Sequence, residues 1–184
     1  GYEKGAFTGA QQAQAGKFEQ AQDGTLLLDE VTEMPMGLQA KLLRVLQERE
    51  VERVGGKKPV SLNIRIVATS NRDMAEAVAK GVFREDLFYR LNVFPVEIPA
   101  LRQRSLDVVP IARYFLGEHG ARFGRTGVTF SEEAEQMLTA HDWPGNVREL
   151  ENVVQRALIL STGALIEPVH LNLVSRPSPS HLVV

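Results

Sequence analysis

Two short apolar runs, each followed by polar residues, constrain the fold of this chain more than any other feature. The run Thr25–Leu28 is followed by Asp29-Glu30, and the run 63–69 is followed by Ser70-Asn71. Apolar runs of this length are typical of strands that are buried in a parallel sheet. Ligands of open α/β sheets bind at the carboxyl ends of such strands. The pattern therefore predicts an α/β fold with candidate functional residues after both strands.

Helical patterns separate and follow the two runs. Pro35 suits the first turn of a helix. The apolar residues after it recur at helical spacing, at Leu38, Leu42, Val45 and Leu46. A turn is expected at Gly55-Gly56, before the run 63–69. Further helical patterns lie after that run, at 74–80 and 84–91. The run 93–98 predicts a third strand, which Pro95 within it and Pro99 after it mark as short or at an edge.

The second half of the chain contains only helical patterns. One helix is expected before Gly120, one is capped by Ser131, and one runs from Asn146 to about Ser161. The last residues alternate proline and serine, which is the composition of a linker. We therefore expect an α/β domain at 1–99, a small helical domain at 100–174 and a linker or tail at 175–184.

Charge and composition exclude several classes of protein. The chain has 21 Lys and Arg against 23 Asp and Glu, so it lacks the basic field that holds a nucleic-acid backbone. It has no cysteine, which excludes disulfides and thiolate metal sites and agrees with a cytoplasmic compartment. The four histidines have no metal-ligand spacing, and no apolar run approaches the length of a membrane span. We expect no membrane partner.

The acidic pair after the first run resembles a Walker B motif. In such a motif the first carboxylate, here Asp29, holds Mg²⁺ on a nucleotide, and the second, here Glu30, polarises the attacking water. The pair could instead favour the positive end of the helix that follows it. The pair alone leaves both interpretations open.

The hexapeptide Gly5, Ala6, Phe7, Thr8, Gly9, Ala10 precedes that strand. By this GAFTGA sequence, the chain resembles the AAA+ domain of bacterial sigma-54-dependent transcriptional activators. The resemblance implies that these six residues contact the sigma-54 factor. Physically, the glycines allow the loop to change shape, while Phe7 and Thr8 offer an aromatic face and a hydroxyl. An ordinary glycine-rich surface turn is the alternative.

Further matches to this family follow in the family's order, from Gly1 to about Leu173. Ser70-Asn71 resembles the sensor I residues that detect the γ-phosphate, although the family often has Thr-Asn there. The segment 83–91 resembles the one that carries arginine fingers, and the resemblance assigns that role to Arg84 and Arg90. Pairing of these arginines with neighbouring acidic residues on the same helix is the alternative.

The segment 143–150 reads WPGNVREL, which matches the sensor II motif and assigns nucleotide sensing to Arg148. Asn146 can cap the helix, with Glu149 three residues later. Arg148 stands in the first turn, where its charge opposes the helix dipole. A phosphate would remove that conflict, and a salt bridge to Glu151 is the alternative.

The family's phosphate-binding loop, a glycine-rich segment that ends in Lys-Ser or Lys-Glu, does not occur in these 184 residues. The resemblance therefore implies an AAA+ P-loop NTPase-type parallel sheet whose N-terminal part is missing, followed by a small α-helical lid domain. A chain without that loop should neither hydrolyse ATP nor be very stable. We expect this stretch to be inactive alone and to be part of a longer protein.

The resemblance implies a parent protein that forms a ring, a hexamer, and hydrolyses ATP with Mg²⁺ between subunits. Its partners would be the sigma-54 factor and RNA polymerase, with DNA bound only through a helix-turn-helix domain absent from this chain. One alternative is a non-catalytic remnant that binds a partner through the GAFTGA loop. Another is a different AAA+ machine, such as a Lon-like or helicase-loader ATPase.

Overall fold

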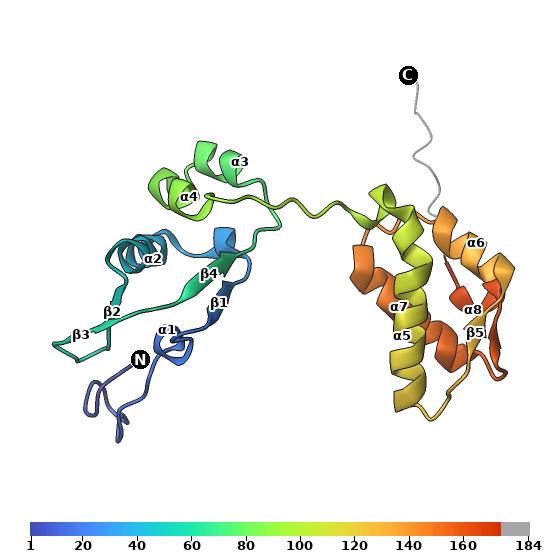
Figure 1. The fold of residues 1–184 in the computed structure, drawn as a ribbon, viewed down its shortest axis with the longest axis horizontal. Helices are drawn as coiled ribbons and strands as arrows, with labels where there is room; N and C mark the ends of the chain where they lie inside the picture. The colour runs from blue at the N-terminus through green and yellow to red at the C-terminus, as the bar shows by residue number, and fades with distance from the viewer. Residues whose placement is uncertain (174–184) are drawn as a thin grey trace. The chain divides into compact units, whose positions relative to one another are not determined.

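The structure is a computed structural model that describes residues 1–173. The chain divides into two compact units, Gly1–Val96 and Glu97–Val184. Each unit has its own hydrophobic core and its own helices and short strands (Figure 1). The tail predicted at 175–184 lies outside the described residues. None of the described helices is both long and apolar enough to cross a membrane.

The first unit contains a parallel sheet of two strands. Strand β1 (Thr25–Leu28) pairs in register with β4 (Arg65–Ala68), which confirms both predicted strands. Half-buried residues alternate with exposed ones along each strand, as the period of two in a strand requires. Leu27 is 57% exposed and Val67 is 40% exposed. The sheet therefore packs one face on the core and presents apolar side chains on the other.

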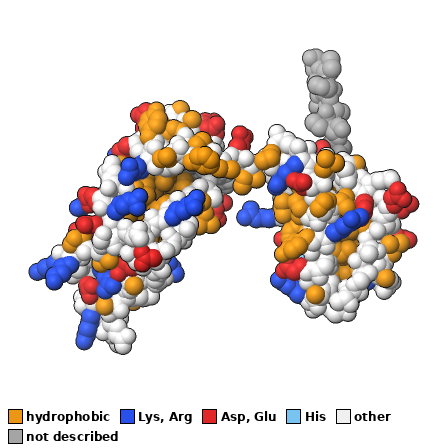
Figure 2. Space-filling model, viewed as in Figure 1, with side chains coloured by type: hydrophobic (Ala, Val, Ile, Leu, Met, Phe, Trp, Pro, Cys, Tyr) orange, Lys and Arg blue, Asp and Glu red, His pale blue; other side chains and the backbone are white. Residues whose placement is uncertain are grey.

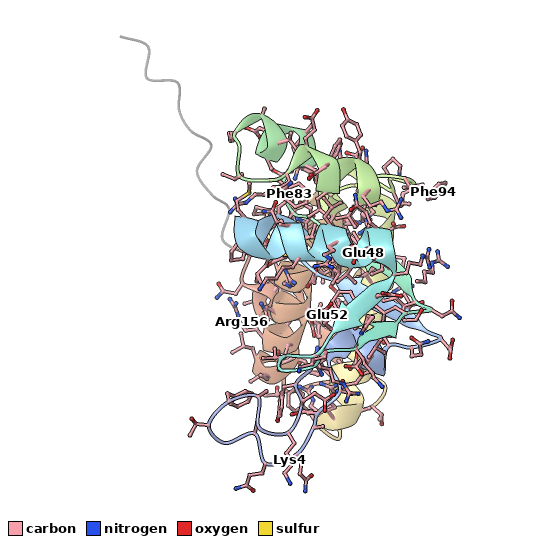
Figure 3. The ribbon with its side chains drawn as sticks, turned by 90° about the vertical axis from the view of Figure 1, so that its left-hand side faces the viewer. Lys4, Glu48, Glu52, Phe83, Phe94 and Arg156 are labelled. Carbon is pink, nitrogen blue, oxygen red and sulfur yellow. The ribbon has the colours of Figure 1, made fainter. Side chains whose placement is uncertain are left out.

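The helices of the first unit cover the buried face of the sheet. They are the helices α1 (Lys17–Gln20), α2 (Met36–Glu48), α3 (Met74–Ala79) and α4 (Glu85–Leu91) and the 3-10 helix η1 (Val31–Glu33). Pro35 is the N-cap residue of α2, one position before the first turn in which it was expected. Asp73 caps α3 by accepting the N–H of Glu76. Figure 3 shows Phe83 between α2 and α4, and this side chain is 2% exposed.

One polar side chain, Gln39 of α2, is fully buried in this unit. Its amide nitrogen donates to the carbonyls of Met34 at 2.8 Å and Val82 at 3.0 Å. Its amide oxygen accepts the N–H of Arg84 at 2.9 Å. A buried amide is tolerated when its donors and acceptor are paired in this way. Gln39 therefore joins α2 to the loop before α4.

A short antiparallel hairpin, β2 (Glu50–Glu52) and β3 (Pro59–Ser61), follows α2. The predicted turn lies at its tip, where Gly55 has a φ of 78°. The two strands themselves were not predicted, because three-residue strands with charged, exposed residues show no apolar run. The hairpin supports the N-terminal loop, as described below.

The third strand predicted at 93–98 is wrong, because the structure contains no strand there. Val93, Phe94, Val96 and Ile98 are 72% to 85% exposed, and Figure 3 shows Phe94 pointing outward. A strand requires a neighbour that pairs with its backbone groups, and Pro95 within this segment and Pro99 after it have no N–H to donate. The segment therefore has the composition of a strand, but it does not form one because no neighbouring strand pairs with it.

The second unit is mainly helical. Its elements are the 3-10 helices η2 (Leu101–Gln103) and η3 (Ser105–Asp107), the helices α5 (Val108–Arg122), α6 (Glu132–Ala140), α7 (Asn146–Leu160) and α8 (Pro168–Leu171), and the strands β5 (Thr129–Phe130) and β6 (Leu165–Ile166). Ser131 caps α6 by accepting the N–H of Ala134 at 3.1 Å, which confirms that prediction. The expectation of helices alone is wrong, since β5 and β6 form a short parallel pair.

The turn before α7 differs from the predicted cap. Gly145 occupies the N-cap position, and its N–H donates to the carboxylate of Glu149 at 2.8 Å. Asn146 has a φ of 52° and its side chain accepts the N–H of Leu101 at 2.9 Å. The predicted capping by Asn146 is therefore wrong, because its side chain binds another segment. Trp143 is fully buried in this turn and donates through Nε1 to the carbonyl of Leu138.

Candidate functional site

Two carboxylates follow β1 at its carboxyl end. Asp29 and Glu30 are both exposed. Glu30 has left-handed backbone angles, with φ 51° and ψ 48°, which are uncommon for a residue other than glycine, asparagine or aspartate. The chain turns at this residue into the 3-10 helix η1. Both candidate catalytic carboxylates therefore lie in a sharp turn at the end of the sheet.

The hydroxyl group of Thr69 connects these two residues. It donates to Oδ1 of Asp29 at 2.5 Å and accepts the backbone N–H of Glu30 at 3.2 Å. The backbone carbonyl of Thr69 also accepts the N–H of Val31 at 2.9 Å. Sequence reasoning missed Thr69. The parallel register contained the signal, because the residue after β4 lies beside the residue after β1.

The predicted sensor residues lie next to this turn. The hydroxyl of Ser70 is 3.1 Å from that of Thr32, and it also donates to the carbonyl of Arg72 at 2.7 Å. Asn71 is exposed, and its side chain has no hydrogen-bond partner among the described residues. The structure thus brings Ser70 to the same end of the sheet as the carboxylates, but its hydroxyl bonds to other groups.

The oxygen atoms at this turn offer few ligands for Mg²⁺. Among residues 1–173, no group of three or more side chains of the ligating types could hold a metal ion. Oδ1 of Asp29 accepts a hydrogen bond, while its second oxygen has no donor among the same residues. Mg²⁺ usually binds one or two carboxylates together with phosphate oxygens and water. The single free carboxylate oxygen therefore fits a magnesium–nucleotide complex better than a metal held by protein alone.

The two candidate arginine fingers, Arg84 at the N-cap of α4 and Arg90 within that helix, have partners within their own unit. Arg84 forms two hydrogen bonds to the carboxylate of Asp86, at 3.0 and 2.7 Å. This bond lowers the pKa of the Asp86 carboxyl group below its ordinary value. Arg90 donates to the carbonyl of Leu46 near the end of α2, at 2.9 Å. The structure does not bring either arginine into contact with the carboxylates of the β1 turn.

Arg148 belongs to the second unit, in the first turn of α7. Its side chain is exposed and has no ion pair among the described residues. The alternative partner, Glu151, lies instead 3.4 Å from His119 of α5. A positive charge near a helix N-terminus is unfavourable unless an anion compensates it. Arg148 therefore remains available to an anionic ligand.

The hexapeptide Gly5–Ala10 forms a closed loop in which residues 7–9 are exposed, whereas Ala10, one of the predicted contact residues, is buried. The N–H of Gly5 donates to the carbonyl of Ala10 at 2.8 Å, and the N–H of Ala10 donates to the carbonyl of Phe7 at 3.0 Å. Gly5 and Gly9 have φ values of 82° and 104°, which favour glycine at both positions. Phe7 is 53% exposed and stacks edge-on against Tyr2 at 5.0 Å. Thr8 is exposed at the loop tip.

The base of this loop is tied to the β2–β3 hairpin. The N–H of Glu3 donates to the carbonyl of Val54 at 3.0 Å, beside the hairpin turn. Arg53 also forms salt bridges with Glu3 at 3.1 Å and Glu19 at 2.6 Å. These bonds raise the pKa of Arg53 and lower the pKa of Glu19, in which the hydrogen bond from Arg53 is the largest cause. The base of the loop is therefore held by the hairpin through Val54 and Arg53, while Phe7 and Thr8 at the tip are exposed.

Hydrophobic and basic side chains occupy different parts of the visible surface of the first unit. Figure 2 shows hydrophobic side chains gathered over one part of this unit and basic side chains on its protruding parts. Lys4, at the base of the hexapeptide loop, points outward in Figure 3. The exposed apolar groups include Leu27 and Val67 of the sheet. Leu27 and Val67 are paired across the two strands, so these exposed apolar side chains are neighbours on one face of the sheet.

Family models match both units. Residues 1–97 match the model described as "Sigma-54 interaction domain". Residues 102–181 match the model described as "AAA+ ATPase lid domain". The first match covers more than half of the chain.

Two regulatory proteins illustrate the similarity to known sequences: the response regulator protein FleR and the transcriptional regulatory protein FlbD. FleR of Pseudomonas aeruginosa is 59% identical over 175 residues, which are 95% of this chain and 37% of FleR. FlbD of Caulobacter vibrioides is 57% identical over 173 residues, which are 94% of this chain and 38% of FlbD. This chain therefore spans less than half the length of these relatives.

The fold is also similar to that of a solved protein. The structure of NtrX from Brucella abortus in complex with ATP has a TM-score of 0.79 and 37% sequence identity, and the match covers 92% of this chain and 40% of NtrX. NtrX has also been solved in complex with ADP, with a TM-score of 0.78. These matches confirm the predicted α/β fold class with a helical lid. The chain belongs to the family of sigma-54 interaction domains, with an AAA+ ATPase lid after the α/β part.

Proposed function

We propose that this chain is the main part of the ATPase domain of a sigma-54-dependent transcriptional activator. The observation that carries the proposal is the exposed GAFTGA loop, held at its base within the same unit as the strand that ends in Asp29 and Glu30. A flexible binding loop and a candidate hydrolysis site then belong to one folded body. Movement at the site can be transmitted to the loop when that body has two states.

The chemistry assigned to the site follows from its residues. Asp29 would hold Mg²⁺ on the nucleotide, and the ion would neutralise charge on the phosphates. Glu30 orients the attacking water and accepts its proton. Arg84 and Arg90 stabilise the charge that develops on the transferred group in a neighbouring subunit, once Arg84 exchanges Asp86 for phosphate. Ser70, Asn71 and Arg148 distinguish the nucleotide before hydrolysis from that after it.

The assembly that this chemistry requires is a ring. Arginine fingers act on a site in another copy of the chain, so hydrolysis needs subunits side by side, and we propose a hexamer in the cytoplasm. The partners are the sigma-54 factor and RNA polymerase, which Phe7 and Thr8 contact. Promoter DNA is bound by a helix-turn-helix domain elsewhere in the protein. A two-component receiver domain would supply the signal, as the name of the response regulator protein FleR suggests.

The assignment of domains follows the same proposal. Residues 1–99 form the partial α/β subdomain and residues 100–174 form the lid with Arg148. These 184 residues contain no glycine-rich phosphate loop, so we propose that they do not hydrolyse ATP by themselves. The second candidate function is a non-catalytic module that binds its partner through the GAFTGA loop. The free anion-accessible side chain of Arg148 favours the ATPase.

The test is a Thr8→Ala substitution in the full-length protein, with Thr126→Ala, an exposed threonine of the second unit, as the control. ATP turnover is measured first, followed by open-complex formation at a sigma-54 promoter. We expect a Thr8→Ala protein that still hydrolyses ATP to lose at least about tenfold in open complexes, the effect of about 1.4 kcal/mol at a partner contact. Normal activation by that protein would refute the role of the loop. Activation by a wild-type protein that hydrolyses no ATP would favour the non-catalytic module.

A further inference from the structure

We propose that Thr69 is a positioning residue for the two carboxylates of the β1 turn. This inference rests on the proposed function, because it concerns how Asp29 and Glu30 are held for magnesium–nucleotide binding and hydrolysis. Thr69 is adjacent in sequence to Ser70, to which the family resemblance assigns nucleotide sensing. The geometry nevertheless points to Thr69 as the hydroxyl that controls the acidic pair.

The first step of the argument is the direction of each hydrogen bond. A hydroxyl group has one hydrogen to donate and lone pairs that accept. Thr69 donates its hydrogen to Oδ1 of Asp29 at 2.5 Å and accepts the N–H of Glu30 at 3.2 Å. The side chain of the residue that follows β4 thereby fixes the carboxylate of the first acid and the backbone of the second. Neither bond can be formed by a valine, which has the same shape.

The second step concerns the carboxylate of Asp29. Hydrogen bonds to an ionised carboxylate are short and strong compared with those between neutral groups. Because Thr69 binds Oδ1, rotation of the carboxylate is restricted and Oδ2 is the oxygen left for a ligand. Groups that orient a metal-binding carboxylate usually change metal affinity or activity by about 10-fold to 100-fold when they are removed. Thr69 is such an orienting group for the carboxylate of Asp29.

The third step concerns the backbone of Glu30. Its left-handed conformation, with φ 51°, is unfavourable for a residue with a Cβ atom. Thr69 opposes that cost at two points, since its hydroxyl binds the N–H of Glu30 and its carbonyl binds the N–H of Val31 at 2.9 Å. Loss of the hydroxyl removes only the first bond. The position of the Glu30 carboxylate then becomes less defined.

The neighbouring hydroxyl cannot replace that of Thr69. Ser70 directs its hydroxyl to Thr32 at 3.1 Å and to the backbone of Arg72 at 2.7 Å. Successive side chains at a strand end point to different sides. The two adjacent hydroxyls therefore have separate partners, and only that of Thr69 reaches Asp29 and Glu30.

The experiment compares Thr69→Val, which removes the hydroxyl, with Thr69→Ser, which keeps it, in the full-length protein. Thr25→Val is the matched control, because Thr25 is an exposed residue at the other end of β1. MgCl₂ is titrated at a fixed concentration of a fluorescent ADP analogue, so that binding is read without turnover. The rate of ATP hydrolysis at saturating MgCl₂ is measured separately.

We expect Thr69→Val to raise the half-saturating MgCl₂ concentration about tenfold, while binding of the analogue without Mg²⁺ stays unchanged. Thr69→Ser and Thr25→Val should bind as the wild type does. If Thr69→Val needs no more MgCl₂ than the wild type, this inference is overturned and the proposed function is not. The same holds if Thr69→Ser is as impaired as Thr69→Val, because the methyl group would then be responsible. A wild-type protein that binds no analogue would overturn the proposed function and this inference together.

Discussion

Replacing Gln39 with leucine tests how the first unit holds α4, the helix that begins after Arg84 and contains Arg90. The Gln39 side chain is fully buried and makes three hydrogen bonds, to the carbonyls of Met34 and Val82 and from the N–H of Arg84. Leucine has a similar volume and can make none of them. The substitution therefore removes the polar connection between α2 and the start of α4 with little change in packing volume.

The magnitude follows from the number of bonds. A hydrogen bond within a protein contributes about 1 kcal/mol net, so the three bonds contribute about 3 kcal/mol. A buried leucine returns about 1 kcal/mol, because its apolar side chain gains more from leaving water than the methylene groups of glutamine do. The net loss is then about 2 kcal/mol, or roughly thirtyfold in the equilibrium between the closed and locally opened states.

Hydrogen exchange measured on peptides from 82–91 is the appropriate assay, because it detects local opening in the full-length protein. Gln39→Leu should accelerate exchange in this segment by roughly thirtyfold, with the N–H of Arg84 among the groups that lose protection. Gln47→Leu, an exposed position on the same helix, is the control and should have no effect there. Unchanged exchange in Gln39→Leu would refute the claim that these bonds anchor α4.

Two further predictions concern other parts of the chain. Trp143→Phe removes the hydrogen bond from Nε1 to the Leu138 carbonyl and should lower the free energy of unfolding of the second unit by about 1 to 3 kcal/mol; a thermal transition equal to that of the wild type would contradict this. The pKa of Glu19 is lowered in the folded state, mainly by its hydrogen bond from Arg53. Ionised Glu19 therefore stabilises the folded state when the pH is above the ordinary pKa of glutamate. This stabilisation is lost as the pH falls through the lowered pKa of the folded state. Wild-type protein should therefore be more stable than Glu19→Gln near neutral pH and lose that advantage in acid, as measured by unfolding at each pH, and a difference independent of pH would exclude the ion pair as its cause.

The parts of the fold that were predicted correctly have strong local patterns. β1 and β4 are apolar runs with polar ends, and α2 has apolar residues at helical spacing after Pro35. Such patterns need no knowledge of distant residues. Ser131 is a similar case, because an N-cap depends on bonds within four residues.

The errors arose where the outcome depends on a distant partner. The segment 93–98 has strand composition, but strand formation requires a neighbouring backbone that its own sequence does not specify. Asn146 was expected to cap its own helix, whereas its side chain binds the N–H of Leu101, 45 positions away. Competition between a local and a distant bond is decided by tertiary packing, which a single sequence does not reveal.

The candidate site shows the same division. The motif residues Asp29, Glu30 and Ser70 could be identified from the sequence, and the structure places them at one end of the sheet. Thr69 could not be identified from its motif, because its role depends on the register between β1 and β4. Arg53 was missed for a related reason, since its partners Glu3 and Glu19 are 50 and 34 positions away.

The left-handed backbone of Glu30 places two demands on one position. Glycine would adopt φ 51° without the cost of about 1 kcal/mol or more that a Cβ atom incurs. Glycine would also remove the carboxylate to which we assign activation of the water. When random variants are selected for thermostability alone, glycine should therefore be selected at position 30, and the resulting proteins should be inactive. Such an outcome is expected wherever activity and stability conflict. Position 30 is best kept fixed when this domain is engineered for stability.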